Sequence, residues 1–263
     1  MGSKRFSFRA SDASVIQIEA HDVLPSTADL AKEYADAGYP DRFVVFADRQ
    51  TTAPITGTKL KEGASEEGIF MSCILRPSLF ASQTAFLRIM TAVALQSALA
   101  EHSPRRFGIG WVSDIYCEGK RIGGATLEGK LDAYTAFEYM IVTFAVRTDK
   151  ENFPPRLTDM IRKVFETDGA SLQMIIGYTI LSRFFALYPS LKTPQKFMKE
   201  YSKNFVLRGK TIKLRQSDGR YKRTKVLGVD PKKGALCVEA KRGEVALVTA
   251  SGVILPKRIK MPT

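Results

Sequence analysis

The residue types best suited to bind an anionic group gather in one stretch of this chain, FGIGWVSDIYCEGKRIGGATLE, which covers residues 107–128. Adjacent glycines weaken a β-strand unless a ligand or another backbone must approach closely. A cation beside such bare backbone can hold a carboxylate or a phosphate. The stretch offers an aromatic ring, a carboxylate, a cation and paired glycines, namely Trp111, Asp114, Arg121 and Gly123-Gly124.

The same stretch predicts a β-hairpin that would position these side chains. The segments DIYC and RIGGATLE have strand character, and Glu118-Gly119-Lys120 supplies a turn in which Gly119 can take a positive φ. A plain hairpin with a bulge at Gly123-Gly124 accounts for the same residues, and the local pattern favours that structural explanation. The choice between a bulge and a ligand site therefore stays open at this point.

The elements before the hairpin follow a strand–helix–strand order. Residues 15–20 alternate as a strand, Pro25-Ser26-Thr27 predicts the N-cap of a helix over Ala28–Ala37, and Gly38 closes that helix. Residues 1–14 are polar and are expected to be frayed. Three more elements follow before the hairpin: strands Phe43–Ala47 and Ile69–Pro77, and a core helix Gln83–Glu101.

The elements after the hairpin change in character along the chain. Ala136–Val146 predicts a buried strand, and three helices are expected, beginning at Phe153, Ser171 and Pro194. From Leu207 to Leu255 short alternating strands are separated by turns, which predicts a small β-barrel. Residues 196–263 hold 18 Lys/Arg and 5 Asp/Glu, a net +13, whereas residues 1–195 hold 22 of each. The basic end therefore predicts an acidic partner.

Composition excludes several classes of function. The three cysteines are scattered and there are only two histidines, which argues against a disulfide framework, a zinc site or histidine-based catalysis. No signal peptide is visible, and the most apolar helix, over Leu172–Tyr188, carries Arg183 inside. We therefore expect a cytoplasmic protein with no membrane partner and no bound metal.

The order WVSDIYCEGKRIGG resembles the biotin protein ligase family, whose pattern is Lys-Trp-Pro/Val-Asn-Asp-Ile/Leu-Tyr, a short turn, then Lys-hydrophobic-Ala/Cys/Gly-Gly-Ile. Further matches are Ser26-Thr27 before a helix, Gln50-Thr51 after a strand, and SCILRP at residues 72–77. The resemblance covers roughly Val15 to Leu255. It implies an α+β fold: a mixed β-sheet flanked by helices in a class II synthetase-like ligase core over residues 1–206, then an SH3-like barrel over residues 207–263, without an N-terminal winged-helix domain.

The resemblance also implies the roles of individual residues. It places Arg121 where the family has its catalytic lysine. It assigns the small acid to Ser26, Thr27, Gln50, Thr51, Trp111, Gly123 and Gly124. It assigns the nucleotide to Thr56, Gly57, Thr58, Asp114 and Arg147.

Several family residues are replaced in this chain. The loop that reads Ala-Gly-Arg-Gly-Arg-Arg-Gly in the family reads TAPITGT here, at residues 52–58, so its arginines are absent. Ser113 stands for an asparagine, and residues 143–147 read TFAVR where the family has Gly-Ile-Gly-Ile-Asn. These replacements fall where the family touches biotin or the adenylate.

Two functions from different classes follow. The first is a biotin–protein ligase that uses ATP and Mg²⁺ to make biotinyl-AMP and passes the biotinyl group to a lysine of a biotin carboxyl carrier-type protein. The second is a catalytically impaired ligase-like protein that binds a small acid or a nucleotide. Nucleic-acid binding by the basic barrel ranks last, because its strands carry few aromatic residues to stack on bases. A homodimer is left open.

Overall fold

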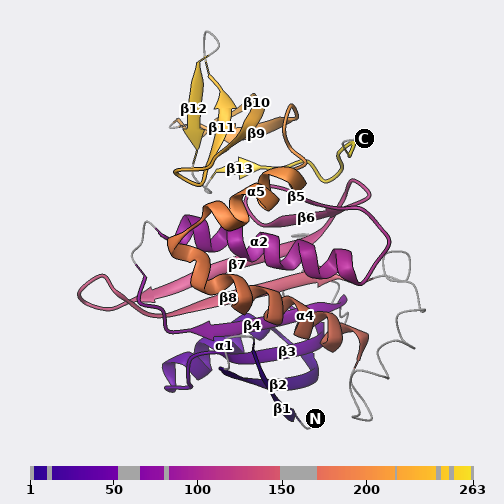
Figure 1. Ribbon diagram of the computed structural model, residues 1–263, viewed down its shortest axis with the longest axis vertical. Helices are drawn as coiled ribbons and strands as arrows, with labels where there is room; N and C mark the ends of the chain where they lie inside the picture. The colour runs from indigo at the N-terminus through magenta and orange to yellow at the C-terminus, as the bar shows by residue number, and fades with distance from the viewer. Residues whose placement is uncertain are drawn as a thin grey trace.

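The computed structural model describes residues 3–10, 14–52, 66–79, 83–148, 171–216, 218–240, 244–248 and 252–261. It contains a large mixed sheet covered by helices and, beyond it, a smaller sheet formed by the C-terminal part of the chain (Figure 1). The predicted α+β class and its mixed, helix-flanked sheet are confirmed. The loop of Thr56, Gly57 and Thr58, and the helix expected to begin at Phe153, lie outside the described residues.

The large sheet has eight strands, and every neighbouring pair is antiparallel except β2–β3, which is parallel. The central strand β3 is buried on both faces because apolar residues follow one another without alternation. In spatial order the strands are β1 (Lys4–Arg9), β2 (Val15–Leu24), β3 (Phe43–Gln50), β4 (Glu66–Leu75), β8 (Phe137–Arg147), β7 (Lys120–Leu131), β6 (Asp114–Cys117) and β5 (Phe107–Ile109).

Helices cover the two faces of this sheet unequally. Helix α1 (Thr27–Asp36) lies on one face, where Ala31 and Ala35 pack against Phe43 and Val45. The opposite face carries the larger core. It is covered by α2 (Thr84–Glu101), α4 (Leu172–Leu187), the 3₁₀ helix η2 (Tyr188–Lys192) and α5 (Gln195–Asn204).

Helix α4 and the turn after it form a stretch, Gln173–Lys192, that is long and apolar enough to cross a membrane by length and composition. In this fold it is a core helix: Ile176, Ile180 and Phe184 are fully buried against the large sheet and its neighbours. Its Arg183 forms an ion pair with Glu101 of α2 at 2.8 Å. Burial of the apolar side chains inside the protein therefore accounts for its hydropathy.

The expectation that residues 1–14 are frayed is wrong for most of that segment. Strand β1 pairs with β2 from Lys4↔Ala20 to Arg9↔Val15. Its Phe8 ring packs edge-on against Tyr178 of α4, with centroids 4.4 Å apart. The apolar residues of KRFSFR alternate with polar ones, which is the period of a half-buried strand.

The C-terminal sheet has five antiparallel strands in the order β12-β11-β10-β9-β13. Among the described residues its two edge strands, β12 and β13, are not paired with each other. The strands are β9 (Thr211–Arg215), β10 (Tyr221–Asp230), β11 (Ala235–Glu239), β12 (Val245–Val248) and β13 (Val253–Ile254).

Candidate functional site

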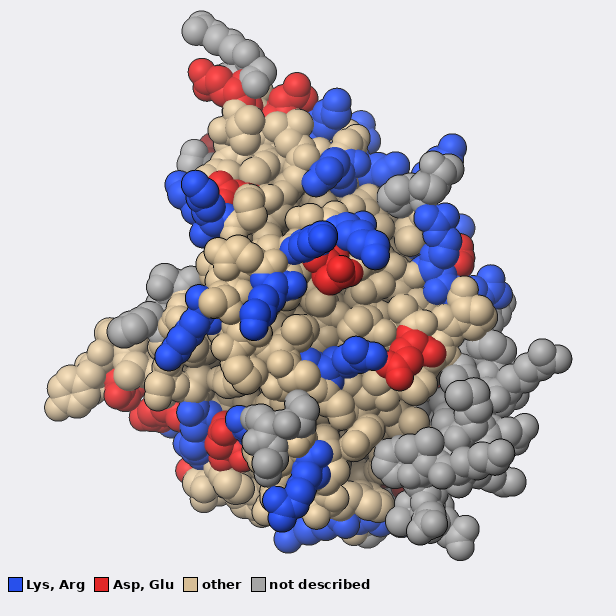
Figure 2. Space-filling model, in the orientation of Figure 1, with Lys and Arg blue, Asp and Glu red and all other residues tan. Residues whose placement is uncertain are grey.

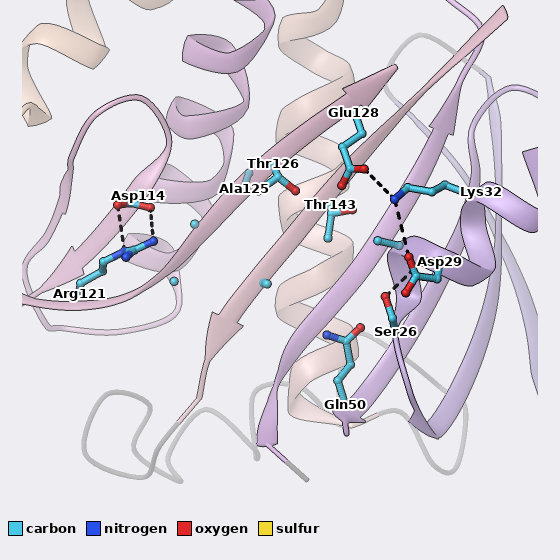
Figure 3. A pocket seen from close by; sticks show the side chains of 14 residues that line it. Ser26, Asp29, Lys32, Gln50, Asp114, Arg121, Ala125, Thr126, Glu128 and Thr143 are labelled. Atoms are coloured by element: carbon cyan, nitrogen blue, oxygen red, sulfur yellow. Dashed lines mark hydrogen bonds and ion pairs between the residues drawn. The ribbon is translucent and has the colours of Figure 1, made fainter. Parts of the chain in front are cut away.

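A cavity of about 350 Å³ lies between the N-terminus of α1 and the face of the sheet formed by β7 and β8 (Figure 3). It is lined from elements far apart in the sequence, and it contains six residues expected to form the site: Ser26, Gln50, Asp114, Arg121, Gly123 and Gly124. Convergence of these residues from α1, β3, β6 and β7 makes the cavity the candidate functional site.

The wall formed by α1 is fixed by its cap. The Ser26 hydroxyl accepts a hydrogen bond from the Asp29 N–H at 3.2 Å, as expected of an N-cap. The Thr27 N–H donates to Oε1 of Gln50, the last residue of β3, at 2.6 Å. Because Oε1 of Gln50 is used in this way, its Nε2 group is the donor that remains for a ligand.

Hydrogen-bonded hydroxyl groups connect this wall to strands β4 and β8. The fully buried Ser72 of β4 donates from its hydroxyl to Oγ1 of Thr27 at 3.0 Å, and it lies 2.9 Å from Oγ1 of Thr143 on β8. Three strands and the first turn of α1 are therefore joined by buried hydrogen bonds. Such a network keeps Thr143 in one orientation at the cavity wall.

Arg121 and Asp114 face each other at one end of the cavity (Figure 3). Nη2 of Arg121 donates to Oδ1 of Asp114 at 2.9 Å, and Nε lies 2.9 Å from Oδ2. This side-by-side pairing fixes the orientation of the planar guanidinium relative to the carboxylate. An acid or phosphate entering the cavity would meet a cation already held in place by one carboxylate.

The pH dependence of stability should reflect the Asp114 carboxyl. Burial raises its pKa from 3.8 to about 6, against the opposing attraction of Arg121. Between about pH 4 and pH 6 the folded protein therefore holds a proton that the unfolded chain releases, so stability falls as pH rises through this window. Urea unfolding of the parent and of Asp114→Asn across this range should show a steeper fall in the parent, because Asp48, whose pKa burial also raises, is present in both proteins. An identical pH profile for the two proteins would contradict the assignment.

Gly123 and Gly124 are consistent with both explanations left open by the sequence, a bulge in the hairpin and a ligand site. A Cβ on Gly123 would lie 2.1 Å from the Ala145 carbonyl oxygen, and one on Gly124 would lie 2.5 Å from the Ser113 carbonyl oxygen. The glycines are therefore required by close approach of neighbouring strands. They also line the cavity. The register shift falls beside them, where Ile115 pairs with Gly123 but Tyr116 pairs with Arg121.

The other end of the cavity carries a second group of charges (Figure 3). Nζ of Lys32 lies 2.7 Å from Oε2 of Glu128 and 3.7 Å from Oδ1 of Asp29. All three side chains are at least one-third exposed, so solvent weakens these pairs. The cavity is thus charged at both ends, with hydroxyl and amide groups between them.

Other predicted site residues do not line the cavity. Thr27 is fully buried behind its wall, and Thr51 donates its N–H to the Leu24 carbonyl at 3.1 Å. Trp111 packs in the core, and its Nε1 has no hydrogen-bond partner among the described residues. Arg147 lies two residues beyond Ala145 on β8 and so shares its side of the strand.

The cavity also includes residues that the sequence did not single out. Ser26, Asp29 and Lys32 are spaced by three residues at the start of α1, and Gly124, Thr126 and Glu128 by two residues on β7. Helix and strand periodicity from the predicted residues would have found them. The missed lining residues are Asp29, Lys32, Ala125, Thr126 and Glu128, whereas Ala28, Thr143 and Ala145 line the cavity at positions where family residues are replaced.

The sequence is similar to that of one well-defined group of proteins, although no family model matches the chain. It is 27% identical over 230 residues to the bifunctional ligase/repressor BirA of Bacillus subtilis (strain 168), covering 85% of this chain and 69% of that protein.

Solved structures share the fold. A biotin protein ligase from Aquifex aeolicus in complex with biotin and ATP is 18% identical, with a TM-score of 0.66, covering 90% of this chain and 97% of that chain. A biotin protein ligase-like protein of unknown function from Silicibacter sp. is 15% identical, with a TM-score of 0.57, covering 89% of this chain and 94% of that chain.

Fold and cavity together define an α+β protein with a cavity between a capped helix and a glycine-containing hairpin. The chain is therefore similar in sequence to the bifunctional ligase/repressor BirA, and it shares the fold of solved biotin protein ligases.

Proposed function

We propose that this chain activates a small carboxylic acid, biotin in the first instance, with ATP and transfers the acyl group to a lysine of a carrier protein. One observation carries the proposal: Arg121 faces the same cavity as Ser26, Gln50 and the Gly123-Gly124 backbone. The relatives are named as ligases, and the solved structures include complexes with biotin and with ATP.

The proposed reaction has two steps. The carboxylate oxygen of the acid attacks the α-phosphorus of ATP and pyrophosphate leaves, which gives the acyl adenylate. The neutral amine of the carrier lysine then attacks the acyl carbon, loses a proton and displaces AMP. Both steps develop negative charge that a positioned cation can stabilise.

The residues of the cavity suit the first step. Arg121 would bind the carboxylate or the α-phosphate, in competition with Asp114, which forms an ion pair with the guanidinium. Arginine can keep the charge of the family's lysine but presents a planar fork of donors rather than a point charge. The Gln50 amide and the Ser26 hydroxyl would hydrogen-bond the polar head of the acid at the wall formed by α1.

Magnesium would come with the nucleotide. Among the described residues no three His, Cys, Asp or Glu side chains form a group that could hold a metal ion. Mg²⁺ is usually bound through substrate phosphates and one or two carboxylates. The acidic side chains that line the cavity are Asp29, Asp114 and Glu128. We also propose that the protein works in the cytoplasm.

A second candidate is a ligase-like protein that binds the acid but activates it poorly. The replaced residues 52–58 favour it, because the family's arginines are absent there. Thr143 and Ala145 also favour it, because both line the cavity where the family has glycines. Their side chains narrow the space open to a ligand.

A calorimetric titration tests the acid site itself. The protein is titrated with biotin alone and then with biotin in the presence of ATP and Mg²⁺. The proposal expects saturable binding of biotin and tighter apparent binding with ATP, because adenylate formation consumes the bound acid. No heat in either titration would mean that the cavity takes a different acid.

The basic C-terminal part is proposed to attract an acidic carrier domain. Basic side chains gather around the C-terminal sheet on the face seen in Figure 2, and on β10 the side chains of Lys222, Arg223 and Lys225 are exposed. Arg223 lies directly opposite Lys213 on β9, a pairing of like charges that an acidic partner would relieve.

Reversing Lys222, Arg223 and Lys225 to glutamate should slow association with the carrier at low salt by about tenfold or more. The reason is that steering acts over the Debye length, about 10 Å at 0.1 M salt, so the effect should fade as salt rises. Stopped-flow association rates measure it. Reversing Lys4, Arg9 and Lys192, exposed cations outside the C-terminal sheet, changes net charge equally and serves as control. Equal association rates for the two triple variants would exclude the exposed cations of β10 as the surface that attracts the carrier.

A further inference from the structure

A segment near the end of the described chain forms an isolated β-bridge with the hairpin that carries Arg121. The Arg121 N–H donates to the Lys257 carbonyl at 3.1 Å, and the Ile259 N–H donates to the Gly119 carbonyl at 2.8 Å. An antiparallel bridge pairs Lys120 with Arg258 between these two bonds. Residues 256–259, which we call the tail strand although they form only one bridge, therefore pair with the hairpin after the chain has completed the C-terminal sheet.

The tail strand occupies a place that no other strand fills among the residues that the structure describes. Pairing between β7 and β8 ends at Gly123↔Val146, so residues 119–121 extend past the end of β8. On their other side the same residues pair with β6, where Tyr116 lies opposite Arg121. The backbone at Arg121 is therefore held by β6 on one side and by the tail strand on the other.

Two side-chain features fit this docking closely. The hydroxyl of Tyr116, a fully buried residue, donates to the Pro256 carbonyl at 2.5 Å. A Cβ on Gly119 would lie 2.2 Å from the Ile259 carbonyl oxygen, so the tail strand can approach only because this residue is glycine. Gly119 also has a φ of +81°, as the turn requires.

We propose that the tail strand is a positioning element for the acid site: by fixing the backbone of residues 119–121, it directs the Arg121 guanidinium into the cavity. The cavity and the tail strand are then coupled. A ligand that binds Arg121 favours the docked tail strand. Undocking the tail strand lowers the affinity for the ligand by the same factor. The C-terminal part of the chain thereby contributes to the site without lining it.

The test compares two substitutions at one residue. Ile259→Pro removes the N–H that bonds Gly119, and the restriction that proline places on Arg258 suits an extended chain. Ile259→Ala keeps the N–H and loses most of the side chain, so it controls for packing. We expect Ile259→Pro to weaken binding of biotin by about tenfold relative to Ile259→Ala.

A double-mutant cycle separates positioning from a general structural effect. If the tail strand acts through Arg121, Ile259→Pro should cause no further loss of biotin affinity in a protein that already carries Arg121→Ala. Multiplicative losses in the double variant would overturn the proposal. Equal affinities for Ile259→Pro and Ile259→Ala would overturn it as well.

A measurement without ligand keeps this proposal distinct from the proposed function, on which the affinity test rests. The titration of the Asp114 carboxyl can be followed by NMR in the parent and in both Ile259 variants. Undocking should move Arg121 away from Asp114, so the pKa of that carboxyl should rise in Ile259→Pro and stay unchanged in Ile259→Ala. An unchanged titration in Ile259→Pro would refute positioning even if biotin binds. A shifted titration with no biotin binding would leave positioning intact and refute only the choice of acid.

Discussion

Replacing Arg121 by alanine is expected to slow formation of the acyl adenylate by about 10²–10³, the usual cost of losing one preorganised donor to developing charge. Arg121 is the cation that Asp114 holds at the end of the cavity, 2.9 Å from each carboxylate oxygen. Without it, the entering carboxylate or the α-phosphate would face the Asp114 carboxylate with no compensating charge. Single-turnover formation of labelled adenylate measures the rate.

Arg121→Lys is the matched control for this substitution. It keeps the charge and restores the residue type of the family, but it loses the planar fork that pairs with Asp114. We expect a rate between those of the parent and Arg121→Ala. If Arg121→Ala forms adenylate as fast as the parent, the cation that assists the reaction is another residue, and the role given to Arg121 is wrong.

Replacing Gly123 by alanine is expected to lower the free energy of unfolding by about 3–5 kcal/mol, a loss typical of severe overpacking. The new Cβ would lie 2.1 Å from the Ala145 carbonyl oxygen and 2.8 Å from the Val146 Cα, both of them backbone atoms of the neighbouring strand. Backbone cannot move aside as a flexible side chain can. Strands β7 and β8 would have to separate beside the cavity.

Gly38→Ala separates the steric clash from the cost of the backbone angle. Both glycines have a positive φ, +153° at Gly123 and +85° at Gly38, but nothing lies within 4 Å of the position of a Cβ on Gly38. It should cost about 1–2 kcal/mol, the penalty for placing an L-residue in that region. Urea unfolding of both variants gives the comparison. Equal costs would show that the close approach at Gly123 is easily relieved.

The elements that the sequence predicts best are those set by local chemistry. Ser26 caps α1 and Gly38 follows its end with a positive φ, because capping depends on a few neighbouring residues. The hairpin turn is predicted correctly for the same reason: Glu118 and Gly119 both take the positive φ of a two-residue turn. The buried strands follow from their apolar residues.

The parts that the sequence does not predict depend on long-range pairing. Strand β1 needs β2 and α4 to bury Phe6 and Phe8, so its short alternating pattern alone is weak. The second charged end of the cavity joins Lys32 of α1 to Glu128 of β7, 96 positions apart in the printed sequence. The tail strand is similar, because nothing in residues 256–259 indicates that their partner is the hairpin at residue 119.

The central claim is that this cavity activates an acid with ATP, and pyrophosphate exchange tests it most directly. The parent protein is incubated with ATP, Mg²⁺ and labelled pyrophosphate, with and without biotin, and the label entering ATP is measured. We expect exchange that depends on biotin and is lost in Arg121→Ala. Saturable binding of biotin without any biotin-dependent exchange would contradict it and would identify the chain as a binding protein with a ligase fold.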